Sequence, residues 1–519
     1  MVGNSTLGRV ILGWARSKIL VTAFVAVFPL LTAAPLVADT TTLRVGFPVA
    51  AATGGYPFAR DDGGGLRFAF YDGLTRFTPV GELQPALATS WQNETPTTWV
   101  FKLRKGVVFS NGEPFNADTV VATLTQLYNP EVLHPKKADM GTINGYRVRD
   151  PYTVEITTSE PDPLIPKRMS QLPMIEPKAW LALGKDGYAR TPIGTGAYTV
   201  ESWGNNRTKP TLVVAESSWR KVQHIKRVEM TIIPDPGTRV GGLLSRELDM
   251  AISLASDDIA MLKANDITIQ MTTNPSILSI ALRTVRPDDS PIKDARVRQA
   301  INYAVDKQSI ADIILGGTSR VAHQPSTPDL IGYNPEAEPF DYNPDKARQL
   351  LADAGYPDGF SLKFAVYGGV LPGDTLIFQK VAQDLAAIGV QTELRQISFP
   401  DYVRRLFNAD WDDIDGFSIG WLNMQLWDPQ KSFEQFSCDY TAPFYCDEGM
   451  MPLLDGARTE MDPIKREAML KDIVLRFRDQ AAALWLVEFA GANGLQPGYQ
   501  VGRFRLDGSV YEQIGYVGN

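Results

Sequence analysis

Helix and strand patterns alternate in the second half of the chain, and this alternation limits the possible folds more than any other sequence feature. Residues 343–355 have an asparagine cap, a first-turn proline and a closing glycine, which predict a helix. A second helix is predicted over 374–389, with Asp374 as its cap. Residues 361–367 lie between the helices and 391–396 follow the second, and both are strand-like. This order predicts βαβ units and therefore an α/β domain.

The length of the chain indicates more than one domain. With 519 residues it is too long for one hydrophobic core and fits two or three domains. Hydrophobic residues make up 44% and charged residues 21%, values typical of globular proteins. A glycine-rich segment at 52–65 is expected to be a loop. Strand-like runs dominate the first half, at residues 98–103, 153–157, 197–202, 211–215 and 227–233.

The N-terminus has the layout of a secretory signal peptide over residues 1–38. Three basic residues precede an uncharged apolar stretch that ends in small residues, and cleavage is expected after Ala38 or Ala34. The alternative is a retained membrane anchor, since about 20 apolar residues can span a bilayer. Two prolines in the stretch disfavour a continuous helix, so we expect removal of the segment and a periplasmic location.

Cys438 and Cys446 are the only two cysteines. Neither is near residue 38, so the lipid anchor of a bacterial lipoprotein is excluded there and a free periplasmic protein is predicted. In an oxidising compartment such a pair is expected to form a disulfide. The bond closes a short loop, so the expected stabilisation is modest, about 2–3 kcal/mol. No histidine lies near the pair in the sequence, which disfavours a metal site.

The charge balance disfavours nucleic acid as a partner. The formal net charge is −8, and it becomes −11 once the three basic residues of the leader, Arg9, Arg16 and Lys18, are removed. Nucleic-acid phosphates attract basic surfaces, which an acidic mature protein does not offer on balance. The acidic balance does not by itself indicate a ligand.

One motif matches the sequence pattern of a catalytic site. Gly416 to Gly420 spells G-x-S-x-G, the nucleophile elbow of α/β-hydrolases, but the histidine base should follow the serine. Here His134, His224 and His323 all precede Ser418. The four aspartates between 410 and 415 lack the ligand spacing of a calcium loop and are expected to form a solvated turn. We therefore predict no catalytic residue, no metal site and no cofactor.

A series of further motifs extends over most of the chain and is its most specific signal. It begins with Tyr-Asp-Gly-Leu at 71–74, Leu-Ala-Thr-Ser-Trp at 87–91 and FKLRKGVVFSNGEPF at 101–115. In this order the motifs resemble those of the family 5 extracellular solute-binding proteins, which deliver dipeptides, oligopeptides, nickel or opine-like compounds to ABC importers. The later motifs of the series are PIGTGAYTVESW at 192–203, DARVRQAINYAV at 294–305, YNPDKARQLLADAGYPDGF at 342–360, Gly420-Trp421 and Asp428-Pro429.

The resemblance implies an architecture. The expected fold is α/β, a two-lobed periplasmic-binding-protein fold of the type II, large peptide-binding class, with a hinge and an interlobe ligand cleft. Lobe I, with an extra subdomain, is expected over 39–278, and lobe II over 279–482. Residues 483–519 would return to lobe I. Strands at 277–282 and 483–489 would form the hinge, and a protein of this kind closes on its ligand by bending at a few hinge residues.

The resemblance also implies ligand-binding positions in lobe II. Trp421 is expected in the cleft, and its alternative role is a core aromatic. Many peptide-binding relatives carry an aspartate three residues further along, where this chain has Met424 after Asn423. This departure disfavours a buried peptide ammonium, which needs a polar or charged partner. Asp428 could substitute, although it belongs to an Asp-Pro that the family usually carries for structure.

Three other residues are candidates for the site. Arg283 stands where relatives commonly carry asparagine, and an arginine suits a carboxylate or phosphate through bidentate hydrogen bonds. Its alternative role is a surface or interlobe salt bridge. Tyr56 and Tyr71 are candidates for the walls of the site, with packing as their alternative role.

The function implied by the resemblance is capture without reaction. The chain is expected to be the periplasmic solute-binding component of an ABC importer, a monomer that docks on permease subunits in the inner membrane. Short peptides are the leading ligand class. The departures at Met424 and Arg283 favour the alternative of an anionic opine or sugar-phosphate-like solute. A periplasmic hydrolase that uses paired carboxylates, and a chaperone-like role, are the competing classes.

Overall fold

A ten-stranded sheet is the largest element of the computed structural model, which describes residues 40–59, 66–368, 373–502 and 510–517. The strand order is β14-β13-β15-β12-β16-β11-β1-β10-β9-β8. Pairing is mixed: β1 is parallel to β10 and β13 to β14, whereas β12 is antiparallel to both of its neighbours. The strands are β1 (Thr42–Phe47), β8 (Tyr198–Ser202), β9 (Thr211–Val214), β10 (Arg227–Ile232), β11 (Met250–Leu254), β12 (Thr268–Leu282), β13 (Phe360–Val366), β14 (Val390–Gln396), β15 (Gly416–Leu422) and β16 (Ala483–Leu495).

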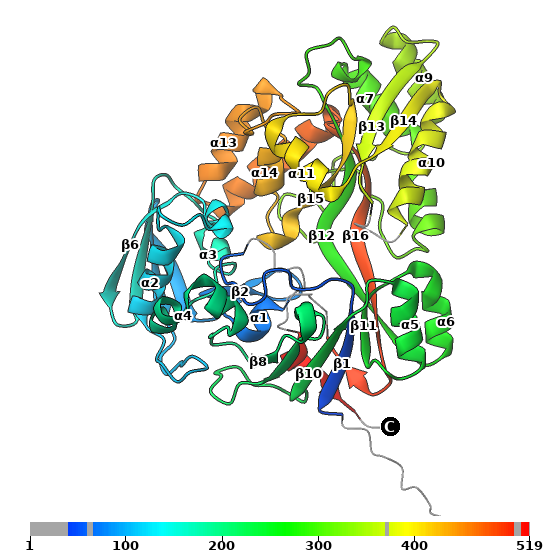
Figure 1. The fold of residues 1–519 in the computed structure, drawn as a ribbon. Coiled ribbons are helices and arrows are strands. Elements are labelled where there is room, and N and C mark those ends of the chain that lie inside the picture. The colour runs from blue at the N-terminus through cyan, green and yellow to red at the C-terminus, as the bar shows by residue number, and fades with distance from the viewer. Residues whose placement is uncertain (1–39, 60–65, 369–372, 503–509, 518–519) are drawn as a thin grey trace, which may run out of the picture. The chain divides into compact units, whose positions relative to one another are not determined.

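Strands β12 and β16 form a long antiparallel pair that joins the two halves of this sheet (Figure 1). One end of the pair adjoins β11, and the other end adjoins β15. The register of the pair shifts between Thr273 and Ile277, where it passes from one group of strands to the other. We call residues 40–267 with 496–517 lobe I, and residues 283–482 lobe II. The predicted two-lobed α/β fold is confirmed.

Lobe I contains a second sheet of four antiparallel strands in the order β4-β5-β7-β6. The helix α2 (Ala117–Leu127) packs on β6 and β7, and the side chain of Asn116 caps its first turn. A short hairpin, formed by β2 and β3, precedes this sheet. The strands are β2 (Thr75–Phe77), β3 (Leu83–Pro85), β4 (Ala88–Thr95), β5 (Thr98–Leu103), β6 (Ile143–Asp150) and β7 (Thr153–Thr158).

The alternating segment of lobe II folds as predicted. The helix α9 (Pro344–Asp353), strand β13, helix α10 (Asp374–Ala386) and strand β14 follow in that order, and the two strands are parallel. The Asn343 side chain caps α9, as its sequence indicates. One detail of the prediction is wrong, because Gly373 occupies the cap position of α10 and Asp374 lies within its first turn.

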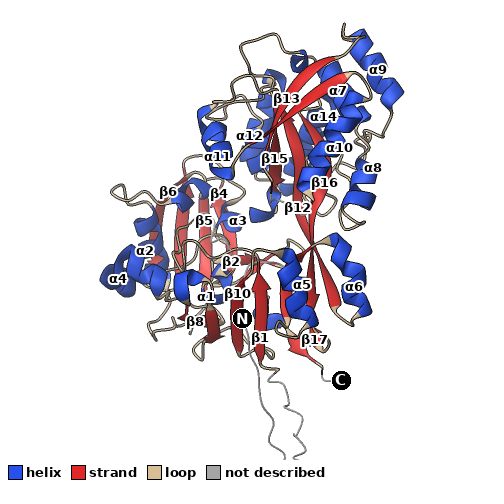
Figure 2. Cartoon of the chain, turned by 45° about the vertical axis from the view of Figure 1, so that its right-hand side comes forward, coloured by secondary structure: helices blue, strands red, loops and turns tan. Residues whose placement is uncertain are grey.

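The other helices complete the cores of the two lobes. In lobe II, α7, α9 and α10 pack on one face of the sheet, and α11 and α14 on the other. In lobe I, α5 and α6 pack beside β11, and Figure 2 shows the two helices next to the strands of this lobe. The helices not yet given are α1 (Arg67–Phe70), α3 (Ile165–Arg168), α4 (Pro177–Arg190), α5 (Pro236–Leu244), α6 (Ile259–Ala264), α7 (Ala295–Ala304), α8 (Lys307–Ser309), α11 (Phe399–Asn408), α12 (Gln430–Gln435), α13 (Met451–Thr459) and α14 (Pro463–Asp479), with the 3₁₀ turn η1 (Pro135–Asp139).

The predicted domain boundaries stay predictions. Thr40–Asn519 form one compact unit, and the boundary at 278/279 falls inside the continuous strand β12. The signal peptide predicted for 1–38 lies outside the described residues. Within the ranges that the structure covers, no helix combines the length and the apolar character needed to cross a membrane.

Candidate functional site

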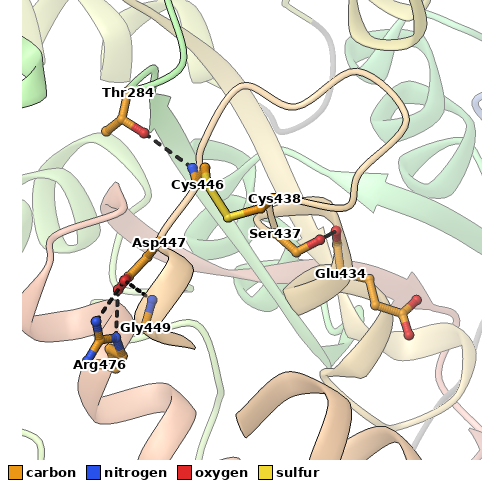
Figure 3. The surroundings of a disulfide bond; sticks show 8 residues. All are labelled: Thr284, Glu434, Ser437, Cys438, Cys446, Asp447, Gly449 and Arg476. Atoms are coloured by element: carbon orange, nitrogen blue, oxygen red, sulfur yellow. Dashed lines mark hydrogen bonds and ion pairs between the residues drawn. A yellow bond between two sulfur atoms is a disulfide. The ribbon is translucent and has the colours of Figure 1, made fainter. Parts of the chain in front are cut away.

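The predicted disulfide between Cys438 and Cys446 is confirmed (Figure 3). It closes a loop that lies against the end of β12, where Thr284 and Val285 donate backbone hydrogen bonds to the Phe444 carbonyl at 3.0 and 3.1 Å. The Cys446 amide in turn donates to the Thr284 hydroxyl at 3.3 Å. The loop also buries the Phe444 ring in the core of lobe II. The disulfide therefore supports the lobe core.

Removal of this bond should have a measurable cost. The double variant Cys438→Ser/Cys446→Ser is expected to unfold with a free energy about 2–3 kcal/mol lower, because the loop regains freedom in the unfolded chain. Urea denaturation followed by circular dichroism measures the difference. Wild-type protein treated with dithiothreitol should show the same loss, and an unchanged midpoint under reduction would contradict this role.

Trp421 lies in the core of lobe II. Its ring has no exposed surface and stacks on Phe436 at a centroid distance of 4.1 Å. It also packs against Phe477 and Trp485, at 5.4 and 6.3 Å. The indole Nε1 donates to the Ser279 hydroxyl at 3.0 Å, which satisfies its one polar atom. This geometry agrees with the core role weighed for Trp421, and its contact with a ligand stays a prediction.

Replacement of this indole separates the two roles. Trp421→Phe is expected to lower the free energy of unfolding by about 1–2 kcal/mol, because it leaves a void and removes the donor to Ser279. Ligand retained by the purified variant, measured by native mass spectrometry, should equal that of the wild type. A folded variant that retains no ligand would instead place the ring in the pocket.

Asn423 and Met424 follow β15 in a short 3₁₀ turn. Asn423 is buried, and its amide donates to the Pro325 carbonyl at 3.2 Å while it accepts from the Ser432 hydroxyl at 2.7 Å. Met424 is half-buried. Asn423 thus holds two neighbouring segments of lobe II together, and contact of either residue with a ligand remains a prediction.

Tyr56 and Tyr71 lie in one aromatic cluster of lobe I. Tyr71 is fully buried, stacks on Tyr188 and donates to the Gly55 carbonyl at 2.7 Å. Tyr56 stacks on Trp180, and its hydroxyl shares a 2.5 Å hydrogen bond with Nδ1 of His134. Burial raises the pKa of Tyr56 to about 12, so the phenol stays neutral. The structure brings these two tyrosines together in the packing of lobe I, and contact of either with a ligand stays a prediction.

Arg283 directly follows β12 and contacts the turn at residues 410–415. It is buried, and its guanidinium donates to the backbone carbonyls of Ile414, at 2.5 Å, and Asp412. Burial and the neighbouring Arg286 lower the pKa of Arg283 to about 10. Those two carbonyls belong to the acidic turn, so Arg283 has a structural role there, and contact with a ligand stays a prediction.

The acidic turn that follows α11 is an ion-pair network. Each of its four aspartates pairs with basic side chains of the protein. Within the described parts of the chain, no three His, Cys, Asp or Glu side chains gather in a way that could hold a metal ion. The pairs are Asp410 with Arg404, Asp412 with Arg405, Asp413 with Lys363 and Arg395, and Asp415 with Arg286.

The G-x-S-x-G segment does not form a nucleophile elbow. Its five residues lie inside strand β15, whereas the elbow needs a sharp turn between a strand and a helix. The Ser418 hydroxyl is buried and accepts a hydrogen bond from the Tyr367 amide at 3.1 Å. Ser418 therefore connects two neighbouring strands of the sheet.

The two lobes meet at a contact surface that we call the seam. Its charged side chains include those of Asp428, Lys167, Asp139 and Lys431, of which Asp428 is the most buried. The Asp428 side chain is fully buried and receives two hydrogen bonds from Arg466 of lobe II, at 2.7 and 2.8 Å. Lys167 of lobe I donates to the same carboxylate at 3.1 Å and to the Trp427 carbonyl at 2.9 Å. Burial alone would raise the pKa of Asp428, but Arg466 and Lys167 hold it well below the usual range.

In a second ion pair across the seam, lobe I supplies the carboxylate and lobe II supplies the cation. Asp139 of lobe I, at the end of η1, accepts from Lys431 of lobe II at 2.8 Å. Lys431 also donates to Gln425 of its own lobe at 2.8 Å, which orients the ammonium. A further pair joins Arg458 of lobe II to Glu160 of lobe I. Each lobe therefore supplies both a cation and a carboxylate to the other.

An apolar contact accompanies these ion pairs. Phe77, at the end of β2, forms a small buried cluster with Leu330 and Trp427 of lobe II. Gly81, in the turn after Phe77, has a φ of +86°, and a β-carbon there would lie 2.0 Å from the Trp427 ring. The hairpin can approach lobe II this closely only because residue 81 has no side chain.

The seam was not predicted from sequence as a site. Of its residues, only Asp428 carried a signal, through the Asp-Pro motif of the family, and that signal indicated structure. Lys167, Lys431 and Asp139 lie 28 residues or more apart in sequence, so local patterns do not connect them. Chemically the seam can hold two lobes closed by charge and shape, which suits capture of a solute.

A cavity of about 460 Å³ lies elsewhere in lobe I, beside the β2–β3 hairpin. Arg76 and Arg220 line it, and both pair with Glu512, at 3.5 and 3.1 Å. None of the ligand-binding residues predicted from sequence lines this cavity. The seam, unlike this cavity, brings charged side chains of both lobes together, and we therefore take it as the candidate functional site.

Comparisons with known proteins agree with this fold. Heme-binding protein A of Haemophilus influenzae is 28% identical over 369 residues, which cover 66% of this chain and 66% of that protein. The glutathione-binding protein GsiB of Salmonella typhimurium is 30% identical over 334 residues, 63% of each chain. The matched segments thus span less than two thirds of the length of these curated relatives.

Among solved structures, the ABC transporter-associated periplasmic binding protein DppA from Helicobacter pylori, in complex with the peptide STSA, has the same fold. Its TM-score is 0.75 at 20% identity, over 92% of this chain and 97% of that one. Residues 82–443, well over half of the chain, match the middle region of the family described as bacterial extracellular solute-binding proteins, family 5. The resemblance found in the sequence motifs is thereby confirmed, and the chain belongs to the family 5 bacterial extracellular solute-binding proteins.

Proposed function

We propose that this chain is the periplasmic receptor of an ABC importer, which captures a short peptide between its lobes and delivers it intact to permease subunits in the inner membrane. The observation that carries the proposal is the seam, where Asp428 and Asp139 each bind a lysine of the opposite lobe. Ion pairs that form only when two lobes meet give the closed state a stabilisation that the open state lacks.

The connection between the lobes supports a closing motion. Strands β12 and β16 join them, and their register shifts between Thr273 and Ile277. Such an irregularity is a place where a few backbone angles can absorb a hinge bend. A receptor that closes in this way shields its solute from water and presents a closed surface to the permease.

Short peptides are the proposed solute class. GsiB, the relative at 30% identity, is a glutathione-binding protein, and glutathione is a peptide with two carboxylates. The solved relative DppA holds the peptide STSA. An anionic solute of another kind is the second candidate, which Met424 favours because an aspartate for a peptide ammonium is missing at that position.

A capture experiment tests the proposal. Purified protein is mixed with an enzymatic digest of casein, freed of unbound peptides and analysed by native mass spectrometry. We expect complexes with one short peptide per chain, and denaturation should release peptides whose masses occur in the digest. New, smaller masses in the supernatant would support a hydrolase instead, and retention of no peptide would contradict the peptide class.

A further inference from the structure

Lys136 is a buried lysine of lobe I beside the seam. It is the second residue of η1, and its side chain is 3% exposed. The backbone amide of Lys136 donates to the Phe58 carbonyl at 3.2 Å, which fixes the turn against the core of lobe I. Its ammonium therefore has little freedom to reach water.

The described carboxylate nearest to this ammonium is shared. Asp139 lies 3.5 Å from Lys136, whereas Lys431 of lobe II donates to the other oxygen of Asp139 at 2.8 Å. Of the residues that the structure describes, the charged groups that face Lys136 are Arg67 from α1, Asp139 from its own turn and Lys431 from α12. Burial, followed by Arg67, lowers the pKa of Lys136 to about 8, and Asp139 offsets this only in part.

Asp428, in the same seam, is an example of a buried charge that is fully compensated by its partners. It receives two bonds from Arg466 and one from Lys167, all at 3.1 Å or less. Among the described residues, Lys136 has one ion pair at 3.5 Å and three charged neighbours, two of which are cations. A buried charge with so weak a partner is costly, and it is common at sites that receive a charged ligand.

We propose that Lys136 binds a carboxylate of the solute, so that the ligand carries a negative group that lies at the seam. This inference rests on the proposed function, because it assigns a place to one end of the captured peptide. Lys431 reaches the same Asp139 from lobe II, so a carboxylate bound there contacts the charge cluster of both lobes. Recognition of the anion is thereby coupled to closure.

The test compares free carboxylates with blocked ones. A casein digest and the same digest after methyl esterification, which removes every peptide carboxylate, are offered to the wild type and to Lys136→Met. Methionine keeps the length and the apolar body of lysine without the charge. We expect the wild type to retain peptides from the acid digest at least tenfold more than from the ester digest, and Lys136→Met to lose this preference.

Controls separate the possible failures. Lys178→Met removes an exposed lysine of lobe I that pairs with Glu113, and it should keep the full preference. Equal retention of acid and ester peptides by the wild type would overturn the inference and leave the peptide receptor standing. Retention of neither digest would overturn the peptide receptor itself. Circular dichroism confirms that each variant is folded.

A second readout follows from protonation. Burial lowers the pKa of Lys136 to about 8 in this structure and a bound carboxylate raises it, so binding near pH 8 is expected to take up protons. Calorimetry of one retained peptide in two buffers of different ionisation enthalpy measures this uptake. Uptake should vanish in Lys136→Met, and an equal uptake in both proteins would overturn the assignment.

Discussion

Asp428→Asn is expected to lower the free energy of unfolding by about 3–5 kcal/mol, the usual cost of removing one partner from a buried ion pair. Asparagine keeps the shape of the side chain but leaves Arg466 and Lys167 without the carboxylate that both contact. Arg466 is 4% exposed, so water cannot replace the lost charge. Urea denaturation of the wild type and the variant at pH 7 measures the difference.

A matched surface pair provides the control for this variant. Asp345→Asn removes a carboxylate that pairs with Arg348 at 2.6 Å while 95% exposed. Exposed pairs contribute about 0–1 kcal/mol, so this variant should stay close to the wild type. Equal effects of the two substitutions would contradict the central position that the structure gives to Asp428.

The difference in free energy of unfolding between the wild type and Asp428→Asn should depend on pH, and this dependence tests whether the charge of Asp428 is responsible. The pKa of Asp428 in the folded protein lies below its value in the unfolded chain, because Arg466 and Lys167 outweigh the effect of burial. Its contribution is therefore complete above about pH 4 and is lost as the pH falls below that value. The gap between wild type and Asp428→Asn should narrow from pH 5 to pH 3, whereas a constant gap would indicate a packing defect.

Local sequence signals predicted the secondary structure of lobe II well. Gly355 and Gly389 follow α9 and α10 with φ values of +93° and +90°, conformations that glycine adopts at little cost. Caps and stops of this kind act over a few residues, so one sequence is enough to read them. The pairing of β12 with β16 joins residues about 200 positions apart, and only the resemblance to a family suggested it.

The candidate site was harder to predict for a physical reason. Strand β15 is covered on both faces, so nearly all its residues are buried and no alternation shows which side faces a cleft. The resemblance places Trp421 in the pocket, and its ring packs in the core of lobe II, so its contact with a ligand stays a prediction. The seam depends on side chains that meet only after the lobes have folded, such as Lys167 and Asp428.

Contact between the lobes can itself be tested at Gly81. Gly81→Leu is expected to weaken retention of casein peptides about 5- to 150-fold, the factor that corresponds to 1–3 kcal/mol of overpacking in the closed state. A β-carbon at this position would lie 2.0 Å from the Trp427 ring, so the hairpin must move away from lobe II. Small-angle X-ray scattering should show a larger radius of gyration than that of the wild type.

The matched control for this variant is Gly112→Leu. Gly112 has a φ of +87°, close to the +86° of Gly81, but no atom lies within 4 Å of a β-carbon built there. Both substitutions therefore impose the same backbone strain, and only the one at Gly81 adds a clash across the seam. If Gly112→Leu retains peptides like the wild type while Gly81→Leu does not, the loss comes from the contact between the lobes. Equal retention by both variants would show that capture does not need the seam to close, and would contradict the closing mechanism.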